Sequence, residues 1–307
     1  MTLALLPATA TRDAHLLLLA RGLRAVSDGF VSIILPAYLL LLGFDALQVG
    51  VLATATLLGS ALLTLVVGLT RARRSTRPLL LAACLLMILT GLGFAAFDDF
   101  WPLLAIAFIG TLNPSAGDVS VFLPLEQAML ARSVSAPDRT ALFARYSLVG
   151  SLFGAGGTLL AALPELAARG GVPPHAAFKG MFVLYAIAGL VAGLVYRRLP
   201  STDVTPGDAP PSALGPSRRI VYRLAALFSL DAFAGGLVVQ SLLALWLLEA
   251  FGLSLAVTAQ LFFWSGLLTS LSYLAAVPLA RRIGLINTMV FTHLPAKASR
   301  LNSAASR

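Results

Sequence analysis

Long apolar runs separated by short polar segments are the main pattern of this chain. A helix of about 20 apolar residues is long enough to cross a bilayer. The runs lie approximately at 15–42, 47–70, 79–97, 101–129, 141–163, 176–196, 220–250 and 255–279. A transmembrane β-barrel would instead need alternating segments of roughly ten residues. Because these runs are longer and continuously apolar, the pattern predicts eight transmembrane helices.

The segment 197–219 interrupts this pattern and is rich in Pro, Gly, Ser and Asp. Such a composition is typical of a flexible linker. We therefore expect a six-helix transmembrane half at 1–196 and an incomplete second half at 220–294. A ninth apolar run begins at Leu285 but ends after about ten residues, too few to span a bilayer. The remaining segment, 295–307, is polar and basic.

Composition supports a membrane protein and defines its orientation. The chain has 307 residues, 58% hydrophobic and 11% charged, and its mean hydropathy is +0.90; soluble domains have about 25% charged residues. Its net charge of +9 would suit nucleic acid, but the basic residues gather in every second loop. This positive-inside pattern places those loops and the N-terminus in the cytoplasm. We expect the lipid bilayer, and no nucleic acid, as partner. The high content of Ala, Leu and Arg suggests a bacterial source, so we expect the protein in a bacterial inner membrane.

Three aspartates, Asp28, Asp118 and Asp231, lie well inside apolar runs. An ionised carboxylate at mid-membrane costs about 2.5–3.5 kcal/mol, so we expect each to face the interior, be paired or be protonated. Arg24 precedes Asp28 by one helical turn, and the two form either a neutral internal pair or a site for charged solute or protons. Asp231 is either a proton carrier or a structural residue. Arg21, nearer the cytoplasm, is expected to snorkel.

The fourth run carries polar residues that a lipid-facing helix does not need. The dipeptide Asn113-Pro114 predicts a kink. Either Asn113 and Asp118 contact a bound solute, or the kink is purely structural. We expect Glu126 at the cytoplasmic helix end, in a surface ion pair with Arg132.

Six spans, a linker and a repeated start resemble the major facilitator superfamily. The start Asp28-Gly-Phe30 recurs as Asp231-Ala-Phe233, which favours a parallel repeat. The segment Leu279–Gly284 reads LARRIG, similar to L-A-D-R-x-G in the family signature G-x-L-A-D-R-x-G-R, with Arg281 in the place of the aspartate. The resemblance implies that cytoplasmic gating loops contain Gly68, Arg71, Arg281, Arg282 and Gly284.

The resemblance implies an all-α integral membrane bundle, with one six-helix half and two to three helices of a second. It implies a secondary transporter that moves a small solute by alternating access, driven by an ion gradient such as protons, without a cofactor. Gln240 is a further candidate for the binding site. The alternatives are a non-transporting fragment or scaffold, and an intramembrane enzyme, for which Trp264-Ser265-Gly266 and His293 give a faint serine-protease pattern.

Overall fold

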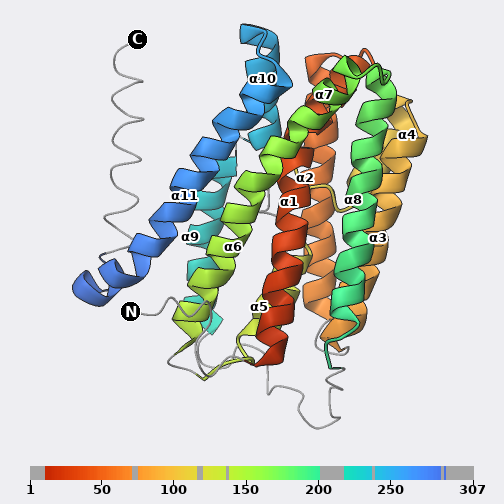
Figure 1. The fold of residues 1–307 in the computed structure, drawn as a ribbon. Helices are drawn as coiled ribbons and strands as arrows, with labels where there is room; N and C mark the ends of the chain where they lie inside the picture. The colour runs from red at the N-terminus through yellow and green to blue at the C-terminus, as the bar shows by residue number, and fades with distance from the viewer. Residues whose placement is uncertain are drawn as a thin grey trace.

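The computed structural model describes residues 11–70, 75–115, 120–135, 138–200, 218–236, 239–284 and 287. Its elements are the helices α1 (Arg12–Leu41), α2 (Ala46–Thr70), α3 (Thr76–Ala96), α4 (Phe100–Ile109), α5 (Phe122–Leu130), α6 (Arg139–Leu159), α7 (Leu163–Arg169), α8 (Pro174–Tyr196), α9 (Arg218–Gly236), α10 (Gln240–Phe251) and α11 (Leu255–Ile283). A short 3₁₀ turn, Leu160–Ala162, joins α6 to α7. The regular elements of the described part of the chain are thus all helices, as predicted, and the long helices run side by side (Figure 1).

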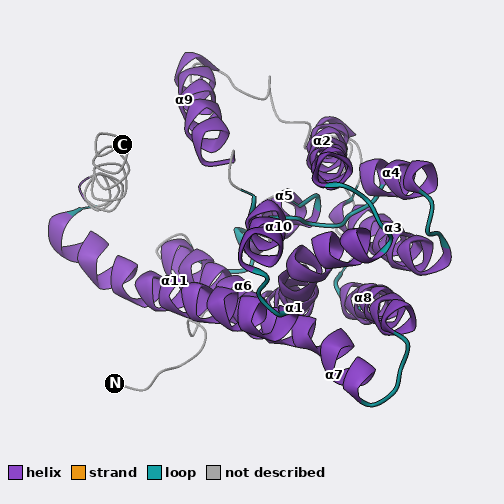
Figure 2. Cartoon of the chain, turned by 90° about the horizontal axis from the view of Figure 1, so that it is seen from above, coloured by secondary structure: helices purple, strands orange, loops and turns teal. Residues whose placement is uncertain are grey.

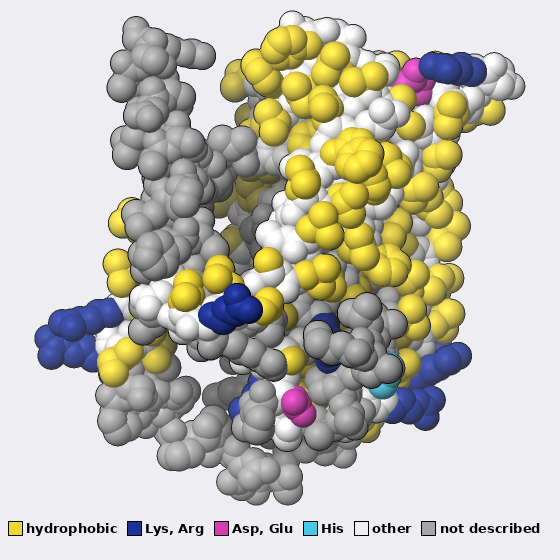
Figure 3. All heavy atoms as spheres, turned by 60° about the vertical axis from the view of Figure 1, so that its left-hand side comes forward, with side chains coloured by type: hydrophobic (Ala, Val, Ile, Leu, Met, Phe, Trp, Pro, Cys, Tyr) yellow, Lys and Arg dark blue, Asp and Glu magenta, His cyan; other side chains and the backbone are white. Residues whose placement is uncertain are grey.

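Six segments of these helices are long and apolar enough to cross a membrane, judged by length and composition. They are Arg12–Leu41, Ala46–Gly68, Thr76–Ala96, Arg139–Arg169, Pro174–Tyr196 and Leu255–Ala275. Hydrophobic side chains cover much of the face shown in Figure 3, and leucines such as Leu58, Leu89 and Leu190 are exposed elsewhere along the helices. Most of the Lys and Arg side chains visible there lie toward the end where α1 begins. This arrangement agrees with a bundle that has lipid at its sides.

Two of the eight predicted spans are not continuous helices. The run 101–129 is divided into α4 and α5, and the described residues between them, 110–115 and 120–121, are not helical. The run 220–250 is divided into α9, which ends at Gly236, and α10, which begins at Gln240. Apolar composition therefore located these runs but did not reveal their breaks.

Helix α1 is the most buried of the candidate spans. In its most apolar window 78% of the residues are buried, against 17–50% in the other five. It packs against α6, α8 and α10, while α3 packs on α8 and α6 on α11. Figure 2, a view from above, shows this central position of α1 and places α9 apart from the bundle. Helix α1 is therefore the element around which a polar interior can form.

Glycines allow α1 and α6 to approach closely. A Cβ atom on Gly29 would lie 2.1 Å from the carbonyl oxygen of Gly154, and one on Gly157 would lie 2.2 Å from that of Val26. Small residues at such crossings let helix backbones meet in a membrane. This contact fixes α6 beside α1 and with it the side chains described below.

Candidate functional site

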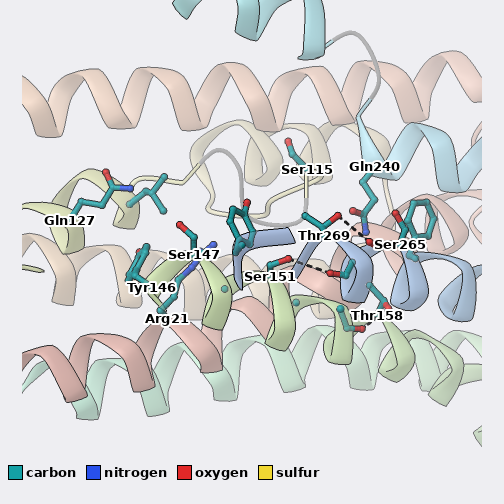
Figure 4. Close-up of a pocket in the computed structure, with 17 residues that line it drawn as sticks. Arg21, Ser115, Gln127, Tyr146, Ser147, Ser151, Thr158, Gln240, Ser265 and Thr269 are labelled. Atoms are coloured by element: carbon teal, nitrogen blue, oxygen red, sulfur yellow. Dashed lines mark hydrogen bonds between the residues drawn. The ribbon is translucent and has the colours of Figure 1, made fainter. Parts of the chain in front are cut away.

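A polar cavity of about 350 Å³ lies among α1, α5, α6, α10 and α11 (Figure 4). Its polar lining consists mainly of hydroxyl and amide side chains: Ser115, Gln127, Tyr146, Ser147, Ser151, Thr158, Gln240, Ser265, Thr269 and Tyr273. Arg21 is the one charged side chain among the described lining residues. Ligand sites usually combine a concave shape with a few convergent polar groups, so this cavity is the leading candidate for a binding site.

Helical periodicity brings the lining residues of α6 to one face. Tyr146, Gly150, Gly154 and Thr158 follow one another at intervals of four residues, and all line the cavity. Positions four apart lie on the same side of a helix. Helix α11 repeats the pattern with a stripe that begins at Phe262, as its lining residues lie at 262, 265, 266, 269 and 273.

Polar contacts hold α10 and α11 against α1 and α6 at this cavity. The Ser270 hydroxyl donates to the Ser151 hydroxyl at 2.9 Å, and Thr158 Oγ1 donates to the Ala259 carbonyl oxygen at 3.1 Å. Gln240 Nε2 donates to Ser32 Oγ at 2.9 Å, so the predicted site residue Gln240 both lines the cavity and joins α10 to α1. Interhelical hydrogen bonds in membranes contribute about 0.6–2 kcal/mol each.

Arg21 lies within the bundle and not at the membrane surface. Its side chain is 8% exposed, its guanidinium carbon is 5.3 Å from the centre of the Tyr146 ring, and a Cβ on Gly150 would lie 2.4 Å from its Nε. The expectation that Arg21 snorkels is therefore wrong. The reason is local: Gly150 leaves space on α6 in which the guanidinium lies. Its Nε and Nη1 are buried and have no hydrogen-bond acceptor in the described part of the chain.

A second arginine, Arg24, belongs to a buried cluster beside the cavity. Its Nη2 donates to Glu126 Oε2 and its Nε donates to the Tyr196 hydroxyl at 3.1 Å. Tyr146 donates to Oε2 of the same carboxylate and Tyr196 to Oε1. The side chains of Arg24 and Glu126 are 2% and 0% exposed, and Phe122 lies under the guanidinium at 4.1 Å. This carboxylate thus balances the charge of Arg24.

The cluster corrects one prediction made from the sequence. Glu126 is not in a surface pair with Arg132, because α5 begins after the break in the fourth run and carries Phe122 and Glu126 toward Arg24. Arg24 forms its ion pair with Glu126 on another helix, a partner that the sequence did not predict. Asp28 is also buried, at 5% exposure.

Asn113 stabilises the break and does not line the cavity. It is 1% exposed, and its Oδ1 accepts the Ser115 backbone N–H at 3.0 Å. The Pro114 carbonyl oxygen accepts the Ser241 N–H of α10 at 3.0 Å, and Tyr185 donates to the Thr111 carbonyl oxygen at 2.9 Å. Irregular backbone at membrane depth is tolerated where protein groups satisfy it, as they do here.

The remaining predicted residues are placed only in part. Asp118, Arg71 and His293 lie outside the described residues, and Asp231 and Arg281 lie in α9 and α11 without a described side chain. Of the other gating candidates, Gly68 is near the end of α2, Arg282 is exposed in α11, and Gly284 follows α11 with φ +85°. Their gating role stays a prediction.

Sequence reasoning missed Glu126, Tyr146 and Tyr196 as members of one polar cluster. One signal was available for Glu126: it follows Phe122 by one helical turn in an apolar run. The tyrosines come from α6 and α8, far from Arg24 in sequence, so their convergence depends on helix packing that no local pattern encodes.

At the opposite end of the bundle, Asp98 between α3 and α4 collects three donors. Lys179 Nζ and His175 Nε2 lie 2.9 Å from its oxygens, and the Tyr38 hydroxyl donates to it at 2.8 Å. Partial desolvation acts to raise the pKa of Asp98, but these hydrogen bonds and the nearby His175 outweigh it and lower the pKa to about 2. The group ties α1 and α8 to the turn that follows α3.

Comparison with known proteins identifies related sequences. The sequence pattern of the Major Facilitator Superfamily matches residues 17–296. The chain is also 28% identical, over 180 residues, to a protein of Saccharomyces cerevisiae named as an uncharacterized membrane protein. That alignment covers 58% of this chain and 40% of the yeast protein, so the chain spans less than half of that relative. A yeast relative gives no support to the expected bacterial source.

Proposed function

Because the chain belongs to the major facilitator superfamily, a family of membrane transporters, we propose that it moves a small polar solute across the bilayer by alternating access. The cavity carries this proposal, because it is polar and is lined on one side by α10 and α11 and on the other by α1, α5 and α6. A solute bound there would be reached from alternate sides as these two groups of helices rock against each other.

The second part of the proposal is that transport is coupled to an ion gradient. The N-terminus is proposed to lie in the cytoplasm. The buried cluster of Arg24, Glu126, Tyr146 and Tyr196 supports the ion coupling, because ionisable groups inside a membrane protein commonly mark ion or proton pathways. Tyr146 connects the two regions: its ring faces Arg21 in the cavity, and its hydroxyl donates to Glu126. A proton arriving at Glu126 would weaken its pairing with Arg24, and Tyr146 would transmit that change to the cavity.

Uptake into liposomes tests the proposal. The full chain, reconstituted with and without a pH gradient, is supplied with a panel of radiolabelled small polar solutes. We expect at least one solute to accumulate above empty liposomes, and more with the gradient. Ser147→Trp fills the cavity and should abolish this uptake. Leu152→Trp, on the outer face of α6 where Leu152 is 42% exposed, should leave it unchanged.

Either of two contrary results would favour the alternative of a non-transporting membrane protein or scaffold. One such result is that the folded, reconstituted chain accumulates no solute. The other is that the Ser147→Trp and Leu152→Trp variants transport equally well. An enzyme is not proposed, since the family consists typically of transporters.

A further inference from the structure

We propose that the solute is a small oxyanion, a carboxylate or a phosphate ester, and that Arg21 binds its negative group. This inference rests on the proposed function, because it assigns a chemical class to the solute of that cavity. It is carried by one observation: a buried guanidinium faces a polar cavity and has no counter-charge in the described part of the chain.

The buried positive charge of Arg21 requires a negative charge and hydrogen-bond acceptors close to it. Arginine stays protonated in proteins, and a buried charge is costly unless it is paired and hydrogen-bonded. The side chain is 8% exposed, and its Nε and Nη1 are buried donors that have no acceptor among the described residues. None of the described side chains that line the cavity is acidic. An anion entering the cavity would supply both the acceptors and the charge.

The neighbouring cluster does not fill this role. Glu126 already receives hydrogen bonds from Arg24, Tyr146 and Tyr196. Tyr146 offers Arg21 the face of its ring, and its hydroxyl points to Glu126. Two arginines one turn apart on α1 are thus in opposite situations: Arg24 is neutralised within the protein, whereas Arg21 is left for a ligand.

The surroundings of Arg21 suit an oxyanion of limited size. The Tyr146 ring on one side and Gly150 on the other confine the guanidinium, and a guanidinium held in one plane presents paired N–H groups that match a carboxylate or phosphate. Hydroxyl groups of Ser147 and Ser151 line the same cavity and can bind the remaining polar atoms (Figure 4). Its volume of about 350 Å³ is at the lower end for ligand pockets.

Matched neutral and anionic probes test the inference by binding. The full chain in phosphatidylcholine nanodiscs is heated with glycerol or glycerol 3-phosphate, with glucose or gluconate, and with inorganic phosphate, at constant ionic strength. Tryptophan fluorescence reports the unfolding midpoint, which a ligand of the folded state raises. We expect an anionic probe to raise it in a saturable way and its neutral counterpart to leave it unchanged. A parallel titration in phosphatidylglycerol nanodiscs tests whether an anionic lipid headgroup, and not a soluble anion, occupies the site.

Variants assign the effect to Arg21. Arg21→Gln should abolish the anion-dependent shift, and Arg21→Lys should weaken binding at least tenfold, because lysine lacks the planar fork. Gly150→Ala, which displaces the guanidinium, should also weaken it. Arg169→Gln is the matched control, because Arg169 is an exposed residue of α7 whose side chain is 71% exposed. It should bind as the unaltered chain does.

Three results would overturn the inference. The first is an equal shift of the unfolding midpoint with the neutral probes. The second is an anion affinity of Arg21→Gln within twofold of that of the unaltered chain. The third is no anion-dependent shift with any soluble probe at concentrations up to about 10 mM, which corresponds to a binding free energy of about 3 kcal/mol. Uptake of a neutral solute in the liposome assay would then leave the proposed function standing. Failure of that assay, with anion binding intact, would reject transport and keep the binding site.

Discussion

The pair of Arg24 and Glu126 is the most buried ion pair among the described residues, and its stability depends on both partners. Glu126→Gln removes the negative charge and leaves the guanidinium of Arg24 uncompensated in the interior. Breaking a buried pair from one side costs about 3–5 kcal/mol. We expect the free energy of unfolding to fall by that amount, measured by denaturation of the detergent-solubilised chain followed by tryptophan fluorescence.

The controls for this prediction are a double variant and a surface pair. Arg24→Met with Glu126→Leu removes both charges and should destabilise less than Glu126→Gln alone, because apolar replacement of a whole buried pair is often tolerated. Arg169→Gln breaks the exposed pair with Glu165 and should cost less than about 1 kcal/mol. A Glu126→Gln chain as stable as the unaltered one would show that Glu126 does not neutralise Arg24.

Asp98 makes a pH-dependent contribution to stability. Its pKa in the folded protein is about 2, below the ordinary value of 3.8, so folding favours the ionised form. The resulting stabilisation is complete above pH ~4 and is lost as the pH falls through the folded pKa of about 2. Asp98→Asn should therefore lower the unfolding midpoint at pH 6, and the difference should shrink between pH 4 and 2. A difference that is constant across this range would contradict the assignment.

At the scale of single elements, the sequence located the helices well but not their interruptions. Runs of apolar residues predicted α1, α2, α3 and α8 to within a few residues, because lipid and a buried core demand the same composition. The break after α4 begins at Gly110, three residues before Asn113, and depends on partners far away in sequence. Thr111 N–H donates to Thr90 Oγ1 at 3.3 Å, a contact with α3 that no local pattern predicts.

Two glycines of α2 make the packing of this element testable. A Cβ on Gly59 would lie 1.6 Å from the carbonyl oxygen of Phe108, whereas one on Gly50 meets nothing within 4 Å. Gly59→Ala must push α2 away from α4 and should destabilise the chain by about 1–3 kcal/mol. Gly50→Ala should be neutral or stabilising by up to about 1 kcal/mol. Thermal unfolding of both variants measures this contrast, and equal midpoints would contradict the α2–α4 contact.

For the whole molecule, composition and loop charge predicted a helical membrane protein, and the family match confirms the resemblance. The candidate site was only partly predictable. Gln240, a candidate from the sequence, lies at the cavity, and its role in binding stays a prediction. Arg21 was expected at the surface and Glu126 in a surface pair, and both are buried. Hydrophobicity places a residue along the membrane normal, whereas the direction in which it faces depends on which helices meet. That information is spread over the whole bundle.

The contact of α6 with α11 should change during transport if α10 and α11 rock against α1, α5 and α6. The hydroxyls of Ser151 and Ser270 are 2.9 Å apart, so cysteines at these positions should form a disulfide across it. In a Cys84→Ser background, which removes the native thiol, the oxidised Ser151→Cys/Ser270→Cys chain should lose solute uptake in liposomes and regain it on reduction. The single-cysteine chains should transport in both conditions. Full uptake by the cross-linked chain would mean that α6 and α11 do not separate during transport, and alternating access across this contact would then be rejected.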